Sequence, residues 1–121
     1  MVTVTPLEST LGARIIDIKI AHMSPEEWSV VEKAFHDHGA LVFPDQHVSD
    51  EEQAAFGERF GDIELLRDGS QKAVPISNQK PDGTAMDANE TRFKTLRGNE
   101  GWHTDSSYMP LAAKASILSA Q

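Results

Sequence analysis

The chain has 121 residues, no cysteine and a formal net charge of −8. A chain of this length is at most one domain, and without cysteine it has neither a disulfide framework nor a thiolate nucleophile. Its eleven basic residues are scattered among nineteen acidic ones, which argues against a surface for nucleic acid. No apolar run is long enough to cross a membrane, and the first residues lack the basic and apolar regions of a signal peptide. We therefore expect a cytoplasmic protein.

Two strands are predicted at the start of the chain. Residues 2–5 alternate Val and Thr, and residues 13–20 are rich in Ile with charged residues between the apolar ones. Alternation of apolar and polar side chains is typical of a half-buried strand. Gly12 precedes the second run and marks a turn. We therefore expect two strands joined by this turn.

Two capping boxes mark the starts of two predicted helices. In the first, Ser24 is followed by Pro25 and then by Glu27; in the second, Ser49 is followed by Glu52. In a capping box, the Ser and acidic side chains satisfy backbone N–H groups reciprocally, and Pro is favoured at the first helical position. Apolar side chains at helical spacing follow the first box and indicate a buried face. Glycines are expected to end the two helices, namely Gly39 and Gly61.

The rest of the chain carries weaker signals. Residues 40–43 form a short apolar run of strand length, and residues 73–77 and 116–120 are also expected as strands. A strand edge is expected at three apolar residues, Ile63, Leu65 and Leu66. Residues 80–83 contain Pro, Asp and Gly and predict a turn. Residues 84–98 mix polar and small side chains without a clear period, so no regular element is expected there.

An H-x-D pair, His103 and Asp105, lies within residues 101–108. Several of its neighbours are β-formers, so we expect an extended strand, in which residues two apart point to the same side and can meet one ion. An imidazole and a carboxylate are two of the three ligands in the facial triad that holds non-haem Fe(II). Taken alone, the pair could equally be surface residues hydrogen-bonded to each other or to water. The third ligand has to come from elsewhere.

The residues around this pair extend the pattern. Residues 99–108, Asn-Glu-Gly-Trp-His-Thr-Asp-Ser-Ser-Tyr, resemble the W-H-[ST]-D segment of the taurine dioxygenase and 2,4-dichlorophenoxyacetate dioxygenase family. This family consists of Fe(II)/2-oxoglutarate-dependent oxygenases. Residues 11–18 resemble its opening strand, residues 39–46 its first core strand and residues 56–62 the end of its next helix. Residues 65–96 are the least similar part of the chain.

The resemblance implies an α+β fold, the double-stranded β-helix or jelly roll. Residues 1–121 would supply its N-terminal part as a single domain with two flanking helices. His103 and Asp105 would bind Fe(II), and 2-oxoglutarate would be the cosubstrate. The implied reaction hydroxylates a small, anionic organic substrate and releases succinate and CO2.

Three neighbours of the pair receive roles from the same resemblance. Asn99 would hydrogen-bond the substrate or cosubstrate, and Ser106 would offer its backbone N–H to a substrate anion. Each of these two could equally be a turn residue that satisfies its own backbone. Trp102 is expected to pack in the wall of the site rather than to act in catalysis.

In the resembled family, a distal His ligand, an Arg that pairs with 2-oxoglutarate and an assisting Thr lie downstream of the segment that ends this chain. The other histidines all precede the pair; they are His22, His36, His38 and His47. We therefore expect the N-terminal portion of a longer enzyme, inactive alone. The alternative is a non-catalytic remnant or subunit of the same fold that binds a protein partner through an open sheet edge. A homo-oligomer is compatible with either interpretation.

The substrate class is only partly indicated by the resemblance. Relatives use sulfonates, sulfate esters, aryloxyalkanoates and other small acids. Sulfonate-using relatives tend to have a His near the position of residues 65–66, where this chain has two leucines. Taurine is therefore disfavoured, and an aryloxyalkanoate or a similar acid is mildly preferred.

Overall fold

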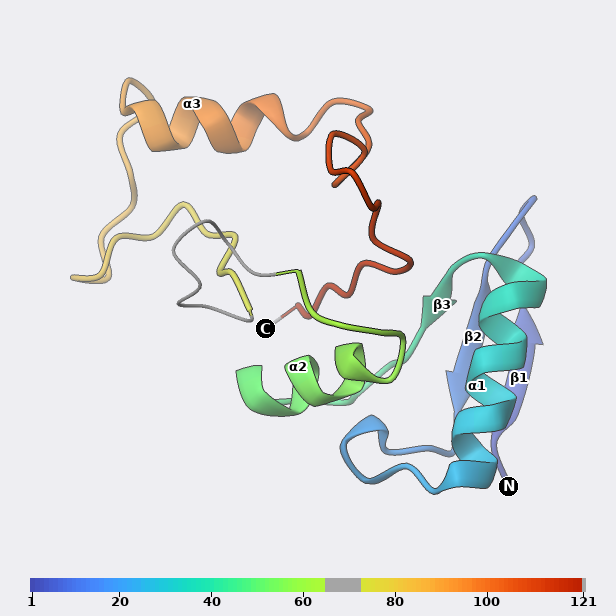
Figure 1. The fold of residues 1–121 in the computed structure, drawn as a ribbon. Helices are drawn as coiled ribbons and strands as arrows, with labels where there is room; N and C mark the ends of the chain where they lie inside the picture. The colour runs from blue at the N-terminus through green and yellow to red at the C-terminus, as the bar shows by residue number, and fades with distance from the viewer. Residues whose placement is uncertain (65–72, 121) are drawn as a thin grey trace.

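The N-terminal part of the chain forms a small sheet with helices beside it (Figure 1). The computed structural model describes residues 1–64 and 73–120. Its elements are, in order, β1 (Thr3–Pro6), β2 (Ala13–Ile16), the 3-10 helix η1 (Ile20–His22), α1 (Pro25–His38), β3 (Leu41–Val42), α2 (Asp50–Glu58) and α3 (Thr91–Gly98). The mixed α+β class predicted from the sequence is confirmed. None of the described helices is long and apolar enough to cross a membrane.

The sheet of the described residues has the strand order β1-β2-β3. β1 and β2 pair in antiparallel fashion across a turn that contains Gly12, whose φ of 105° is a conformation that glycine readily adopts. β2 and β3 pair in parallel, with Ala13 opposite Leu41. A parallel pair needs a crossover connection, and α1 provides it. Ala13 and Ile15 are fully buried, whereas the alternate residues of β2 are exposed.

The strand β2 stops before the end of the predicted run, residues 13–20. Asp17 has a left-handed φ of 61°, which Asp tolerates better than most residues. Its carboxylate accepts a hydrogen bond from Thr3 Oγ1 at 2.7 Å, and the chain then leaves the sheet to form η1. Ile18 and Ile20 are nonetheless buried. The alternation of apolar residues therefore reflected burial in the core rather than a longer strand.

Both predicted capping boxes are confirmed. The Ser24 hydroxyl accepts a hydrogen bond from the Glu27 N–H at 3.2 Å, and the Glu27 carboxylate accepts one from the Ser24 N–H at 2.9 Å. Ser49 and Glu52 repeat the pattern at the start of α2. α1 ends as predicted at Gly39, with a φ of 72°. α2 ends slightly before the predicted glycine, within the usual uncertainty of helix ends.

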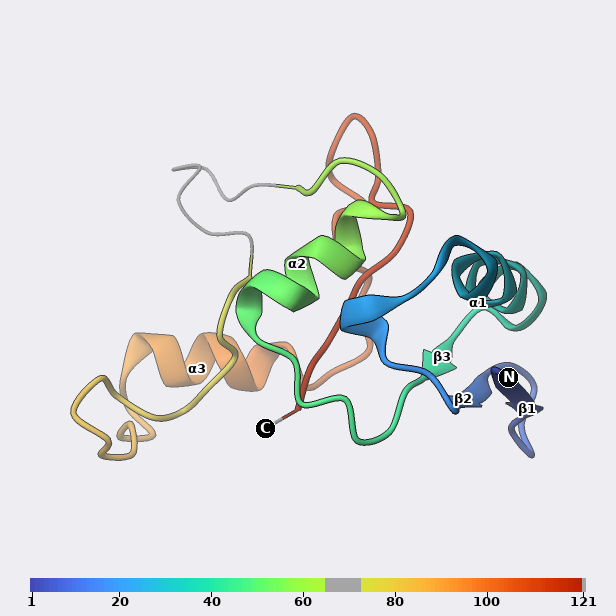
Figure 2. The same cartoon turned by 90° about the horizontal axis from the view of Figure 1, so that it is seen from below.

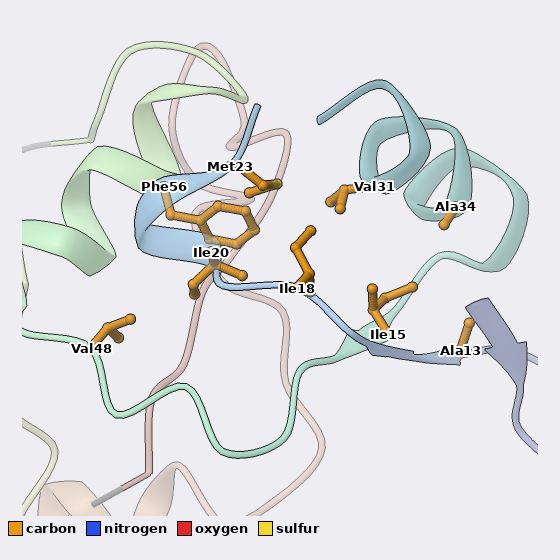
Figure 3. Packing of buried hydrophobic residues seen from close by; sticks show 9 residues of the cluster. All are labelled: Ala13, Ile15, Ile18, Ile20, Met23, Val31, Ala34, Val48 and Phe56. Atoms are coloured by element: carbon orange, nitrogen blue, oxygen red, sulfur yellow. The ribbon is translucent and has the colours of Figure 1, made fainter. Parts of the chain in front are cut away.

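The hydrophobic core joins β2, η1, α1 and α2 (Figure 3). Its buried members are Ala13, Ile15, Ile18, Ile20, Met23, Val31, Ala34, Val48 and Phe56. Aromatic rings extend this core between α1 and the end of α2. The ring centroid of Phe60 lies 4.9 Å from that of Trp28 and 5.2 Å from that of Phe35, both edge to face. Such pairs contribute about 0.5–1.5 kcal/mol beyond the area they bury, so the chain just after α2 is held against α1.

The described residues after position 72 have little core of their own. Of residues 73–120, only Met86 is a buried hydrophobic residue. α3 has no buried residue and lies apart from α1 and the sheet (Figure 2). The sequence did not predict this helix, because a helix without an apolar stripe leaves no periodic signal.

The strands predicted over residues 73–77 and 116–120 are wrong. Both segments are described, and neither has strand conformation. A strand needs a partner for its backbone hydrogen bonds, and within the described part of the chain neither segment has one. The expected strand edge is not formed at Ile63, and its other two residues, Leu65 and Leu66, lie outside the described residues.

The turn predicted over residues 80–83 is confirmed and connects to α3. The Gly83 N–H donates to the Lys80 carbonyl at 2.9 Å. The Lys80 ammonium group lies 2.7 Å from a carboxylate oxygen of Glu90, the N-cap residue of α3. This hydrogen bond, with a smaller effect from the backbone N–H of Asp87, holds the pKa of Glu90 below its usual value.

We expect Ile15→Ala to lower the free energy of unfolding by about 2–5 kcal/mol, because it leaves a cavity in the core. Ile16→Ala is the matched control. It makes the same change at the adjacent residue, which is 39% exposed, and should cost less than about 1 kcal/mol. Urea unfolding followed by circular dichroism measures both losses. Equal losses would contradict this orientation of β2.

Replacing Lys80 by Met should raise the pKa of Glu90, because the carboxylate loses its cationic donor. A carboxyl group whose pKa is lowered by folding contributes stability above its unfolded pKa, and this contribution is lost as the pH falls through the folded value. The Lys80–Glu90 contact should therefore help to hold α3 at neutral pH and disappear in acid. NMR titration of the Glu90 carboxyl carbon measures the shift. Lys94→Met, an exposed position on α3, should leave the pKa of Glu90 nearly unchanged.

Candidate metal centre

The H-x-D pair lies in the loop after α3 and not on a strand. Residues 101–110 contain bends and a turn, so the strand predicted over residues 101–108 is wrong. The β-forming side chains there have no partner strand within the described residues. His103 and Asp105 nevertheless lie close together, with Nε2 of the imidazole 3.3 Å from Oδ1 of the carboxylate. The course of the loop, rather than strand alternation, brings the two donor atoms together.

A backbone carbonyl sets the tautomer of His103. Its Nδ1 atom lies 2.8 Å from the carbonyl oxygen of Gly101. Because a carbonyl oxygen can only accept, Nδ1 carries the proton. In the neutral ring, Nε2 then has a free lone pair and lies beside an oxygen of Asp105. Two electron-rich atoms so close together are favourable only with a proton or a metal cation between them.

The donor set fits a divalent transition-metal ion. Imidazole nitrogen and carboxylate oxygen bind such ions at roughly 2.1 Å, so two ligands at right angles lie roughly 3 Å apart. The observed separation is 3.3 Å. Metal-binding His residues usually donate their other N–H to a carbonyl or a carboxylate, as His103 does to Gly101. The side chains of His103 and Asp105 are 47% and 68% exposed, which leaves room for further ligands.

A third ligand is not found in the described part of the chain. In residues 1–64 and 73–120, no group of three His, Cys, Asp or Glu side chains could hold an ion. The other histidines lie in η1, in the last turn of α1 and in the loop after β3; they are His22, His36, His38 and His47. None of them completes a metal site with the pair.

The other predicted site residues lie on either side of the pair. Asn99 is the C-cap of α3, where its backbone N–H donates to carbonyls of the last turn. Ser106 has a left-handed φ of 55°, and its hydroxyl donates to a carboxylate oxygen of Glu64 at 2.5 Å. The substrate-binding roles of Asn99 and Ser106 stay predictions. Trp102 was expected to pack in a wall, but its relative exposure is 107%, so no described residue covers it.

Helix α2 contacts the segment that follows this loop and the segment that follows α2 itself. Gln53 Nε2 donates to the carbonyl oxygen of Ile117 at 3.1 Å. At Gly57, a Cβ atom would lie 2.9 Å from Ile63 Cδ1 and 3.5 Å from Ile117 Cδ1. The missing side chain therefore lets both isoleucines approach the helix. The sequence analysis identified none of these contacts, although a glycine inside a predicted helix is a recognised sign of close packing.

Comparison with known proteins identifies relatives along the whole chain. The sequence model described as "Taurine catabolism dioxygenase TauD, TfdA family" matches residues 3–121. The chain is 39% identical over 120 residues to (S)-phenoxypropionate/alpha-ketoglutarate-dioxygenase of Sphingobium herbicidovorans and 37% identical over 122 residues to the protein of that name from Delftia acidovorans. Both alignments cover 98% of this chain, but 40% and 41% of the relatives. Alpha-ketoglutarate-dependent 2,4-dichlorophenoxyacetate dioxygenase of Burkholderia sp. is 32% identical over 81% of this chain.

The chain also matches a solved structure. The crystal structure of AAD-2 in complex with Mn(II) and N-oxalylglycine matches with a TM-score of 0.80 and 29% identity. The match covers 93% of this chain and 39% of that chain. The chain thus spans about 40% of the length of the relatives it matches. Because the family's sequence model covers residues 3–121 and the fold matches that of AAD-2, this chain belongs to the TauD/TfdA family of alpha-ketoglutarate-dependent dioxygenases.

Proposed function

We propose that residues 1–121 are the N-terminal part of a single Fe(II)- and 2-oxoglutarate-dependent oxygenase domain. The observation that carries this proposal is the 3.3 Å separation of His103 Nε2 and Asp105 Oδ1, with the His103 proton held on Nδ1 by the Gly101 carbonyl. This arrangement presents one neutral nitrogen and one carboxylate oxygen to an ion. These are two of the three donors of the facial triad that binds non-haem Fe(II).

Each ligand residue has a defined task in this proposal. His103 supplies a lone pair without a proton to displace, because its tautomer is already set. Asp105 supplies a negative charge that offsets part of the charge of the ion. Iron, 2-oxoglutarate and O2 together would supply the oxidising chemistry, in which one oxygen atom hydroxylates a substrate C–H bond and the other ends in succinate as CO2 is released.

The proposed substrate is a small organic anion of the aryloxyalkanoate class. Two of the relatives are named for phenoxypropionate and one for 2,4-dichlorophenoxyacetate. Recognition of the substrate carboxylate requires hydrogen-bond donors, for which charge-assisted bonds are the stronger kind. The backbone N–H of Ser106 and the side chain of the exposed Asn99 are the proposed donors on this chain.

The rest of the site is proposed to come from additional polypeptide. The relatives are longer than this chain, which spans about 40% of their length, and the described residues contain no third ligand. A distal His and an Arg for the far carboxylate of 2-oxoglutarate would complete the site. Without them, two ligands on one loop should hold an ion weakly.

A second function is favoured by exposed apolar side chains in the segment that contains the pair and in the residues after it. Trp102, Tyr108, Leu111 and Leu118 have relative exposures between 81% and 107%. Large apolar side chains are exposed in this way where a protein interface covers them, if they form a contiguous patch. The alternative function is therefore a non-catalytic subunit of the same fold that binds a protein partner and needs no metal.

Anaerobic titration with Fe(II) and 2-oxoglutarate separates the two functions. The experiment uses the longest natural form of the protein, meaning the full polypeptide that the natural gene encodes. If this polypeptide is an oxygenase, it should show the visible charge-transfer band of the iron chelate. His103→Ala and Asp105→Ala should each abolish this band, because each removes a ligand. His36→Ala changes an exposed His near the end of α1 and should leave the band intact. Absence of both the band and succinate formation in the longest natural form would favour the non-catalytic subunit.

A further inference from the structure

A hydrogen bond links the loop of the metal pair to the segment after α2. The hydroxyl of Ser106 donates to a carboxylate oxygen of Glu64 at 2.5 Å, across 42 positions of sequence. Hydrogen bonds to a carboxylate are about twice as strong as those between neutral groups. Ser106 directly follows the proposed ligand Asp105. The position of this hydroxyl therefore constrains the peptide that carries the ligand.

The backbone at Ser106 needs such a constraint. Its φ of 55° is left-handed, a conformation that costs a non-glycine residue roughly 1–2 kcal/mol. Strained conformations of this kind persist only where surrounding contacts hold them. Two contacts do so here, the bond to Glu64 and the hydrogen bond from the Met109 N–H to the Ser106 carbonyl at 3.0 Å.

Glu64 is itself connected to the core. Its neighbour Ile63 packs at Gly57 of α2, where a Cβ atom would lie only 2.9 Å from Ile63 Cδ1. α2 is fixed in turn by Phe56, which belongs to the hydrophobic core. The segment after α2 and the loop after α3 run close together in Figure 2, and the Ser106–Glu64 hydrogen bond joins them. A continuous path of contacts therefore runs from the core to the residue after Asp105.

Glu64 could in principle act as a metal ligand instead. One of its carboxylate oxygens is already bound to the Ser106 hydroxyl. In the described ranges, Glu64 forms no three-residue metal group with His103 and Asp105. The geometry favours a link to Ser106 over direct contact with an ion.

We propose that Glu64 is a positioning residue, which holds the Asp105 carboxylate beside His103 by accepting the hydrogen bond from Ser106. This inference rests on the proposed function, because it assigns Glu64 a task at the same metal pair. The required chemical feature is an acceptor oxygen at position 64. A negative charge at that position is not required.

Two substitutions at Glu64 distinguish an acceptor from a charge. Glu64→Gln keeps an acceptor oxygen and removes the charge, whereas Glu64→Leu removes both. Groups that orient metal ligands typically change metal affinity by roughly 10–100-fold when they are lost. We expect Glu64→Leu to weaken Mn(II) binding by about tenfold or more. The Mn(II) affinity of Glu64→Gln should stay within about threefold of that of the parent. The amide oxygen still accepts the hydrogen bond from Ser106, although a neutral acceptor forms a weaker bond than a carboxylate.

Two measurements on the longest natural form test the proposal. Loss of the free Mn(II) signal in electron paramagnetic resonance gives the affinity, with His103→Ala as the reference for a disrupted site. Hydrogen–deuterium exchange of the Met109 amide reports the order of the loop without any metal, and it should accelerate several-fold in Glu64→Leu. Ser106→Ala should match Glu64→Leu, and the double variant should be no worse than either. Glu8→Leu, a matched change at an exposed residue between β1 and β2, should alter neither measurement.

Three outcomes would contradict either the positioning role of Glu64 or the proposed function. If Glu64→Gln weakens Mn(II) binding as much as Glu64→Leu, the charge is what matters and the positioning role is wrong. If both variants bind Mn(II) like the parent and Met109 exchange is unchanged, the positioning role is also wrong, although the proposed function stands. If the parent binds Mn(II) no better than His103→Ala, the proposed function fails first and the role of Glu64 at the metal falls with it.

Discussion

The packing of α2 against the N-terminal core is the constraint on which the rest of the structure depends. Phe56 is buried in the core, and Phe60 packs edge to face with rings of α1. The hydrophobic contribution of such rings is large because each has a large apolar surface. From this fixed helix, contacts extend to Ile63 and Ile117, which lie on either side of the metal pair in the sequence. Contacts with α2, rather than contacts within residues 101–110, therefore fix where the chain on either side of this loop lies.

The geometry of His103 and Asp105, the two proposed metal ligands, depends on a small number of polar contacts in an exposed loop. The Gly101 carbonyl fixes the proton on one nitrogen of His103 and leaves the other free. Asp105 then presents an oxygen to the free nitrogen. Because the side chains of His103 and Asp105 are 47% and 68% exposed, solvent would weaken a simple ion pair between them. A bound metal ion would interact more strongly with His103 Nε2 and with Asp105 Oδ1 than these two atoms interact with each other.

The two parts of the chain differ in how much hydrophobic core they contain. The sheet, α1 and α2 surround a shared core, whereas residues 73–120 contribute one buried hydrophobic residue, Met86. Several large apolar side chains in this second part stay exposed, and its predicted strands have no partners within the described residues. The relatives are longer than this chain, which spans about 40% of their length.

The sequence alone determined the features that depend on neighbouring residues. Both capping boxes, the stop at Gly39 and the turn at residues 80–83 were predicted correctly, since hydrogen bonds within a few residues decide them. The family was also recognisable from the residues around His103 and Asp105, and the family's sequence model matches residues 3–121. The alternation over residues 13–20 correctly indicated burial even where it overstated the length of the strand.

Only the tertiary structure decided the rest, because distant contacts control it. α3 has no apolar stripe, so nothing in its sequence marked it as a helix. The loop of the metal pair contains β-forming residues, yet a strand without a partner is not stable, and the chain there bends instead. The link from Ser106 to Glu64 spans 42 positions, a separation that no local pattern can bridge. Local chemistry thus supplied the two proposed ligands, and long-range packing decided how they meet.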